Sequence, residues 1–202
     1  QLYDVDLRLR PDGAKGLMSS SLEGLRRYER EHAWTWEHQA LTRARFVAGH
    51  APIGAAFEAE RKAILCMTRD RDALRREVVD MRLRMLAGHA NPTALFDVKH
   101  DPGGMVDVEF SVQYLVLAHA HDHDTLTRNL GNIALLAIAA DLGLIPVPLA
   151  AAAANAYRDY RRLQHQIRLT GAQHARVEAA AQADRRATVS ALWAHVFGGP
   201  WR

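Results

Sequence analysis

Polar and apolar residues alternate strictly at the start of the chain. Between Tyr3 and Arg10 the odd-numbered positions are apolar or aromatic, and the even-numbered positions are charged. Because successive side chains of a strand point to opposite faces, this alternation predicts a half-buried β-strand over residues 2–10. Pro11-Asp-Gly13 predicts the turn that ends it, since proline presets φ and glycine tolerates positive φ.

The rest of the chain carries apolar residues mainly at helical spacing. Ser20 and Glu23 have capping-box spacing and predict the start of a first helix. Further helices are predicted over residues 34–47, 53–65, 70–86, 106–121, 132–142 and 148–169. A last helix is predicted to start at Asp184 as N-cap and to end at Gly198. Residues 96–99 are predicted to be a short extended piece.

These patterns predict a mostly α fold in two parts. A lone strand cannot satisfy its own backbone hydrogen bonds, so its sheet partners are expected outside this sequence. The chain also begins at Gln1, inside the strand pattern, which suggests an excised piece. We therefore predict that residues 1–49 are the end of an incomplete α/β domain. Residues 50–202 are predicted to form a helical bundle domain.

Composition narrows the class of protein. Of the 202 residues, 49% are hydrophobic and 24% are charged, which is typical of a packed globular protein. No apolar stretch is long enough to cross a bilayer, so no membrane partner is predicted. The single Cys66 cannot form an internal disulfide, and no leader sequence is evident. We therefore predict a cytoplasmic location.

The charge pattern argues against a nucleic-acid partner. The formal net charge is +3, and the 26 basic residues are interleaved with 23 acidic ones. A nucleic-acid binder would need a one-sided basic surface with aromatic platforms. None is evident from this pattern.

The predicted strand carries the first candidate for chemistry. Asp6, Arg8 and Arg10 share one strand face at intervals of roughly 7 Å. Nucleotidyl transfer needs carboxylates that hold Mg²⁺ and fixed positive charge that binds phosphate oxygens. Asp4 is expected to be a solvated or salt-bridged neighbour. An exposed strand face with salt bridges would show the same alternation, so the pattern alone leaves both interpretations open.

A second concentration of polar residues covers residues 99–110. The glycines of Asp101-Pro-Gly-Gly104 would permit close approach to a phosphate, and the next helix would point N–H groups at it. An ordinary helix entry, with Asp107 as N-cap and Glu109 on the surface, is the alternative. Two residues apart on a helix, these carboxylates diverge by about 200°, so they are not expected to share a metal.

Two smaller groups also have two interpretations. Trp34 and Trp36 invite nucleotide stacking, but helical spacing favours a packing role, while Glu37 is a candidate for bracing the site with Arg43 and Arg45. His119 and His123 have the spacing of a zinc pair. No further ligands are evident beside them, so solvated imidazoles at a helix end are favoured.

Three blocks of the sequence resemble one family, the glutamine synthetase adenylyltransferases. The pattern V-D-x-R-L-R-P-x-G begins at Val5. The other blocks are Ala33-Trp-Thr-Trp-Glu-His-Gln-Ala-Leu-Thr-Arg-Ala-Arg45 and Lys99-His-Asp-Pro-Gly-Gly-Met-Val-Asp-Val-Glu-Phe110. The family has an AMP-removing and an AMP-adding half, and the Trp34-Thr-Trp-Glu-His-Gln-Ala-Leu41 stretch is similar to the adding, C-terminal half.

The resemblance implies a fold, an activity and partners. It implies that residues 1–49 end a nucleotidyltransferase catalytic domain, in which Asp6 matches the third metal-binding carboxylate. The first two belong to a Gly-Ser…Asp-x-Asp motif that this sequence lacks, so the chain alone is expected to be inactive. Arg8, Arg10 and Lys99 become candidates for nucleotide binding, and Glu37, Asp107 and Glu109 for support of the site or regulation.

The resemblance also supplies the reaction. The parent enzyme is expected to transfer AMP from ATP, with Mg²⁺, to a tyrosine of glutamine synthetase, and to respond to glutamine and the PII signalling protein. Two alternatives stay open. In the first, the chain is part of the deadenylylating half or of the related PII uridylyltransferase. In the second, it is a non-catalytic helical module that binds PII or glutamine synthetase.

Overall fold

The computed structural model describes residues 15–199, so the predicted strand over residues 2–10 lies outside the described part. Within it the chain forms eight α-helices, which confirms the mostly α fold with a helical bundle. These helices are α1 Leu22–Glu31, α2 Thr35–Leu41, α3 Ala51–Leu65, α4 Arg71–Gly88, α5 Met105–His119, α6 Asn132–Asp141, α7 Val147–Leu169 and α8 Ala183–Phe197. None of them is both long and apolar enough to span a membrane.

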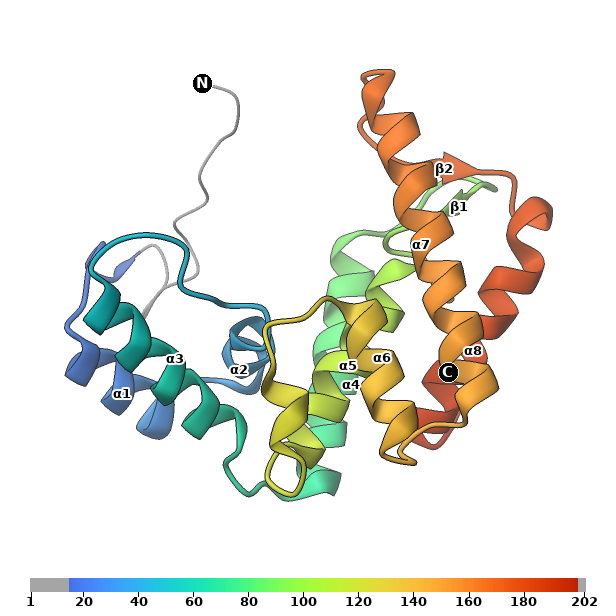
Figure 1. Cartoon of the computed structure of the whole chain (residues 1–202). Coiled ribbons are helices and arrows are strands. Elements are labelled where there is room, and N and C mark those ends of the chain that lie inside the picture. The colour runs from blue at the N-terminus through green and yellow to red at the C-terminus, as the bar shows by residue number, and fades with distance from the viewer. Residues whose placement is uncertain (1–14, 200–202) are drawn as a thin grey trace.

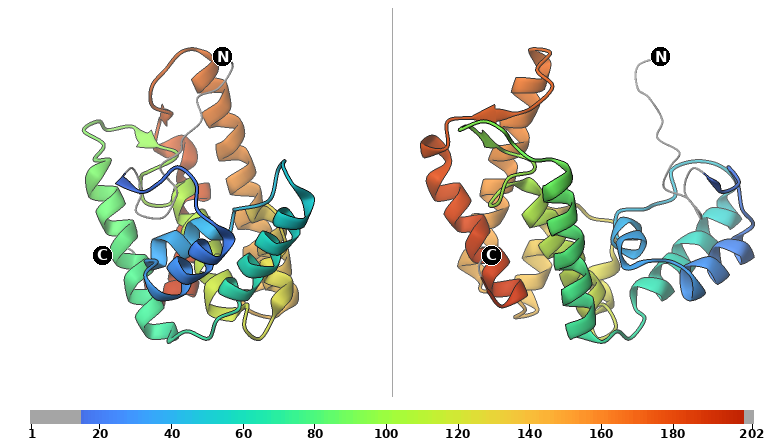
Figure 2. Two further views of the ribbon diagram at one scale, coloured as in Figure 1. Left: turned by 90° about the vertical axis from the view of Figure 1, so that its left-hand side faces the viewer. Right: turned by 180° about the vertical axis from the view of Figure 1, so that it is seen from behind.

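The helices form two groups, α1–α3 and α4–α8 (Figure 1). Helix α3 packs against α1 and α2. Arg26 and Arg30 of α1 both bind the largely buried carboxylate of Glu60 on α3, at 2.9 Å and 2.8 Å. Seen from behind, α4 lies between α8 and the α1–α3 group (Figure 2). The predicted domain boundary at residues 49 and 50 falls just before α3 and stays a prediction.

Helix α5 is the central element of the bundle. It packs against α2, α4, α6, α7 and α8. Twelve of its fifteen residues are buried, because it has neighbours on nearly every side. The sequence shows the same feature as a largely apolar segment without a polar face, which is typical of an enclosed helix. Any side chain near the start of α5 is therefore positioned by several helices at once.

A buried arginine joins the two groups of helices. Arg61 of α3 is 3% exposed, and its guanidinium donates to the carbonyl oxygens of Leu41 at 3.0 Å and Thr42 at 2.8 Å. It also donates to Thr127 at 2.8 Å, in the 3₁₀ turn η2 (Asp124–Thr127). The last carbonyl groups of a helix have no N–H donor within that helix, and here Arg61 donates to those at the end of α2. The helix predicted over residues 34–47 therefore ends at Leu41.

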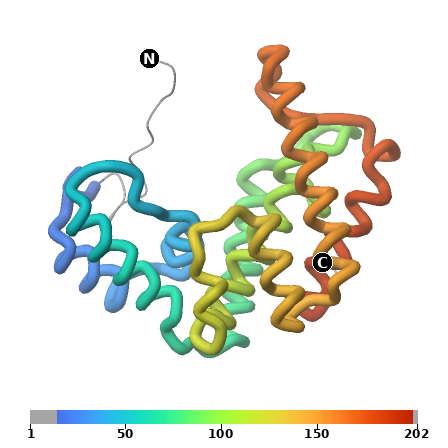
Figure 3. The backbone as a smooth tube through the Cα atoms, viewed as in Figure 1, coloured from blue at the N-terminus to red at the C-terminus, as the bar shows by residue number. Residues whose placement is uncertain are grey.

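A two-stranded ladder closes the other end of the bundle. Strand β1 (Phe96–Asp97) pairs antiparallel with β2 (Arg176–Val177), with Phe96 opposite Val177. The extended piece at residues 96–99 was predicted from the sequence, but its partner was not. The ladder holds the segment before α5 against the segment after α7, and the last turns of α7 extend beyond it (Figure 3).

Two predicted helix starts differ from the structure. The N-cap of α1 is Ser21 rather than Ser20, because the Ser21 hydroxyl accepts from the N–H of Gly24 at 3.0 Å. Helix α8 begins at Ala183 after the 3₁₀ turn η3 (Ala180–Gln182), so Asp184 lies in its first turn and is not its cap. Gly198 ends α8 in the left-handed region with φ 79°, as predicted.

Candidate functional site

The candidate residues fall into separate groups. Asp6, Arg8 and Arg10 lie outside the described residues. Glu37 lies on α2, Asp107 and Glu109 on α5, and Lys99 on the turn between β1 and α5.

Asp107 forms a fully buried ion pair. Its Oδ1 accepts from Nε of Arg82 on α4 at 2.7 Å, and its Oδ2 accepts from the N–H of Gly103 at 2.7 Å. Both side chains are 0% exposed. Arg82 also donates to the carbonyl oxygen of His100 at 2.7 Å. The pair thus fastens the β1–α5 turn to two helices. Gly104, not Asp107, is the N-cap of α5.

The Gly-Gly loop is occupied by the chain itself. Gly103 has φ +83°, and both glycines are buried. The N–H of Gly104 donates to Asp101 at 2.9 Å, that of Met105 to Val98 at 2.9 Å and that of Val106 to Lys99 at 3.1 Å, each to a carbonyl oxygen. The start of α5 therefore has its donors satisfied internally. The phosphate cradle suggested by the glycines does not form here.

Glu109 sits at a junction of four helices, not on an open surface. Its side chain is 21% exposed, and Oε1 accepts from the Tyr157 hydroxyl at 2.8 Å. Arg43, just after α2, lies 3.6 Å from the same oxygen, and Asn132 donates to the Tyr157 hydroxyl at 3.0 Å. Burial, followed by Glu109, raises the pKa of Tyr157 to about 12. Tyr157 therefore stays protonated and donates to Glu109.

Glu37 supports α1 and α2 rather than Arg43. Its Oε2 accepts from the N–H of Trp34 at 2.8 Å, and its Oε1 from the Tyr28 hydroxyl at 2.9 Å. This closes a capping box at the start of α2. The expected link from Glu37 to Arg43 is therefore replaced by the contact of Arg43 with Glu109.

The two tryptophans are exposed, so the predicted packing role is wrong. Trp34 is 70% exposed and Trp36 is 38% exposed. Helix α2 is only seven residues long and buries Gln39 and Leu41 instead. The tryptophans line a hollow of about 390 Å³ that Glu77, Asp80, Met81 and Arg84 of α4 complete.

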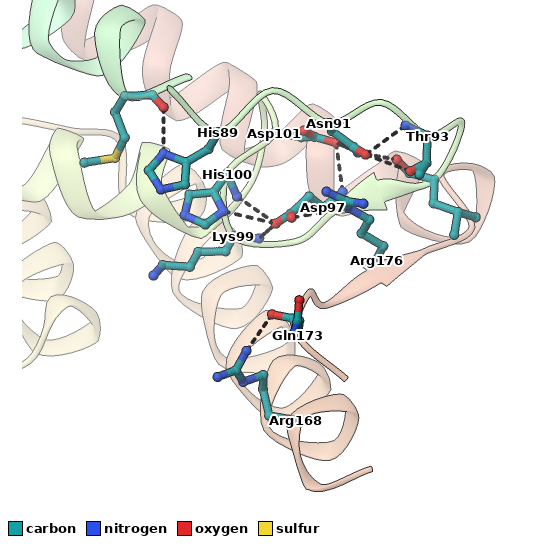
Figure 4. Close-up of polar contacts among 12 residues, drawn as sticks. His89, Asn91, Thr93, Asp97, Lys99, His100, Asp101, Arg168, Gln173 and Arg176 are labelled. Atoms are coloured by element: carbon teal, nitrogen blue, oxygen red, sulfur yellow. Dashed lines mark hydrogen bonds and ion pairs between the residues drawn. The ribbon is translucent and has the colours of Figure 1, made fainter. Parts of the chain in front are cut away.

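Lys99 belongs to a different hollow, of about 440 Å³, together with residues of α7. Its basic lining consists of Lys99, His100, Arg161, His165, Arg168 and His174, which we call the basic hollow. Figure 4 shows Lys99 on the turn before α5 and Arg168 on α7, and both line this hollow. Sequence reasoning missed the α7 residues. The signal was present, because residues 160–177 contain no acidic residue.

No metal centre is evident in the described part of the chain. Within residues 15–199 no group of three His, Cys, Asp or Glu side chains could hold a metal ion. His119 is half-buried rather than solvated, and burial, followed by Arg71, lowers its pKa. Asp107 and Glu109 contact different helices, in line with their expected divergence.

Two family models match the chain. The model of glutamate-ammonia ligase adenylyltransferase matches residues 1–60, and that of GlnD PII-uridylyltransferase matches residues 72–187. The second match covers α4 to the start of α8, which is most of the bundle. Both descriptions name nucleotidyltransferases, and this is the class of enzyme to which the chain is similar in sequence.

Relatives define the family within that class. Three relatives carry the name bifunctional glutamine synthetase adenylyltransferase/adenylyl-removing enzyme. The protein of Bordetella bronchiseptica is 60% identical to this chain, that of Burkholderia pseudomallei 54% and that of Nitrosomonas europaea 51%. Each alignment covers 98% of this chain. The chain belongs to the glutamine synthetase adenylyltransferase family. It spans only 21–23% of the length of these relatives.

Proposed function

We propose that this chain is part of an enzyme that transfers AMP from ATP to a tyrosine of glutamine synthetase, and that it belongs to the adding half. The main support is the similarity to relatives of that name over nearly the whole chain. The stretch from Trp34 to Leu41, which resembles the adding half, supports the choice between halves.

The proposed roles follow the chemistry of the residues. Asp6 would hold Mg²⁺, which supplies positive charge against the phosphate oxygens of ATP. Arg8, Arg10 and Lys99 would bind those oxygens, since arginine presents a planar fork of donors and lysine a point charge. Further carboxylates are expected from parts of the enzyme outside this sequence. The reaction is assigned to the cytoplasm.

The candidates within the described residues act as positioning residues in this proposal. Asp107 and Arg82 fix the turn that carries Lys99. Glu109 holds Arg43 where the α1–α3 group meets the bundle. Neither carboxylate needs to touch ATP for its loss to disturb the site, because positioning alone is costly to lose in such reactions.

A non-catalytic role in regulation is the second candidate. The match of residues 72–187 to the PII-uridylyltransferase model favours it, because it covers the bundle rather than residues 1–60. In this interpretation the bundle binds PII or glutamine synthetase, and glutamine acts as effector elsewhere in the enzyme. The exposed Trp34 and Trp36 offer a contact surface for such a partner.

A chimera tests these alternatives. The matching 197 residues of the Bordetella bronchiseptica relative would be replaced by this chain, which is 60% identical. Transfer of label from ATP to glutamine synthetase, and phosphorolytic removal of that label, would be measured separately. Asp6→Asn removes a metal-binding charge while keeping its size, and Asp4→Asn, in the same predicted strand, is the matched control.

The proposal expects Asp6→Asn to abolish addition of AMP while removal of AMP continues. The reverse pattern would assign the chain to the deadenylylating half. Unchanged rates of both reactions, in a folded Asp6→Asn chimera, would favour the non-catalytic module. The chain without the rest of the enzyme is expected to transfer no label.

A further inference from the structure

The basic hollow is built from two rigid walls. Lys99 and His100 form the first, and their N–H groups both donate to Oδ1 of Asp97 at 3.0 Å. The N–H of the preceding residue, Val98, donates to the carbonyl oxygen of Ala175 at 3.0 Å, which ties this turn to the segment before β2. The turn is therefore held from both sides before any ligand arrives.

The second wall is one face of α7. Arg161, Gln164, His165 and Arg168 all line the hollow, and their spacing is i, i+3, i+4 and i+7. Residues at this spacing lie on one face of a helix. His174 joins them from the segment that follows α7. Basic side chains thus face the hollow from the turn, from α7 and from the segment leading to β2.

The carboxylate in the lining of the hollow already has partners. Asp97 is the only carboxylate in the lining and is 4% exposed. It lies 3.7 Å from Nε of Arg176 and 3.5 Å from Nδ1 of His100, and it accepts the two N–H groups of the turn. Asp159, the last acidic residue of α7, pairs with Arg185 at 3.1 Å.

The cations of the hollow lack such compensation. Among residues 15–199 no ion pair joins Lys99, Arg161 or Arg168 to a carboxylate. On an ordinary solvated face, cations alternate with acidic residues, whereas residues 160–177 contain none. A concave surface lined by charge of one sign focuses the field and raises the local concentration of counter-ions.

We propose that the basic hollow binds a phosphate-bearing small molecule. Arginine forks and a lysine ammonium match phosphate oxygens through charge-assisted hydrogen bonds. The imidazoles of His165 and His174 line the same hollow and can add N–H donors. The volume of about 440 Å³ falls within the range of about 300–1,000 Å³ typical of small-molecule sites.

Direct binding of phosphates to the folded chain tests the proposal. Calorimetric titrations would use pyrophosphate, orthophosphate and ATP, with adenosine and succinate as uncharged and carboxylate controls. Arg161→Gln and Arg168→Gln each remove one cation from the hollow. Arg162→Gln removes the same charge from the adjacent position of α7, which is exposed and does not line the hollow. Circular dichroism would check that each variant is folded.

We expect pyrophosphate to bind at one saturable site. Arg161→Gln and Arg168→Gln should each weaken its binding about tenfold or more, the loss typical of one charge-assisted hydrogen bond. Arg162→Gln should change it less than about twofold, because that side chain lies outside the hollow. ATP binding more tightly than pyrophosphate would identify a nucleotide, and equal binding would identify the phosphate groups alone.

Several results would overturn the proposal. One is the absence of saturable pyrophosphate binding. Another is a loss of pyrophosphate affinity in Arg162→Gln equal to that in Arg161→Gln and Arg168→Gln. A third is succinate binding as tightly as pyrophosphate. The proposal does not rest on AMP transfer. If the chain binds pyrophosphate through Arg168, this inference is supported whatever the chimera does. If the chimera transfers no AMP, the proposed function is refuted.

Discussion

The buried ion pair between Arg82 and Asp107 leads to a quantitative prediction. Asp107→Asn keeps the shape of the side chain but removes its charge, so that Arg82 is left charged in a site that is 0% exposed. The Gly103 N–H and the Arg82 Nε–H both need an acceptor, and the asparagine side chain has one oxygen where aspartate has two.

The expected cost follows from the burial. Removing one partner of a buried ion pair destabilises a protein by about 3–5 kcal/mol, because a charge is left without compensation. For a chain of this length, about 1 kcal/mol corresponds to roughly 2–4 °C in melting temperature. Asp107→Asn should therefore lower the melting temperature by about 6–20 °C.

Urea and thermal unfolding, followed by circular dichroism, would measure the effect. Asp72→Asn on α4 is the matched control, since its exposed carboxylate pairs with Arg75 at 3.4 Å and should contribute less than about 1 kcal/mol. The double variant Arg82→Met/Asp107→Asn removes the remaining buried charge as well and should recover part of the loss. The reasoning is refuted if Asp107→Asn costs no more than Asp72→Asn.

Two further predictions concern pH and packing. Burial, followed by Glu37, raises the pKa of Glu29 to about 7, so the folded state binds an extra proton between about pH 4.5 and 7 and loses stability as pH rises through that window. Glu29→Gln should therefore be more stable than the natural chain at pH 8, by up to about 3 kcal/mol, and equally stable near pH 4. Urea unfolding at both pH values measures this, and a difference in stability that does not change with pH would contradict it. Gly104→Ala should cost about 1–3 kcal/mol, because its Cβ would lie 2.8 Å from the carbonyl oxygen of Asp101. Gly88→Ala is the control, because a Cβ at Gly88 would meet open space. If Gly104→Ala and Gly88→Ala melt at the same temperature, the loop before α5 accommodates the added methyl group and the prediction is wrong.

Local features of the fold were predictable from the sequence. A helix was predicted over residues 70–86, and α4 begins at Arg71, where the side chain of Asp70 accepts from the N–H groups of Asp72 and Ala73. Gly198 ends α8 for an equally local reason. Apolar spacing predicted the positions of the remaining helices to within a few residues, except at the end of α2. These features depend on hydrogen bonds and side-chain contacts within one or two turns.

Part of the candidate site was also visible in the sequence. Asp107, Glu109 and Lys99 were singled out from the sequence as a concentration of polar residues, but their partners were not. Arg82 occupies a buried position one turn after Val78. Its buried carboxylate partner lies 25 residues further along the chain, and spacing within one helix carries no information about it.

Tertiary structure decided which polar residues meet. It brought Lys99 and Arg168 to one hollow, and it placed Arg43 beside Glu109 rather than beside Glu37. It also left Trp34 exposed although its helical spacing favoured burial. Such contacts depend on how helices from distant parts of the chain pack around α5. The sequence by itself determined where each helix and each charge lies along the chain, and packing determined which charges are neutralised and which line a hollow.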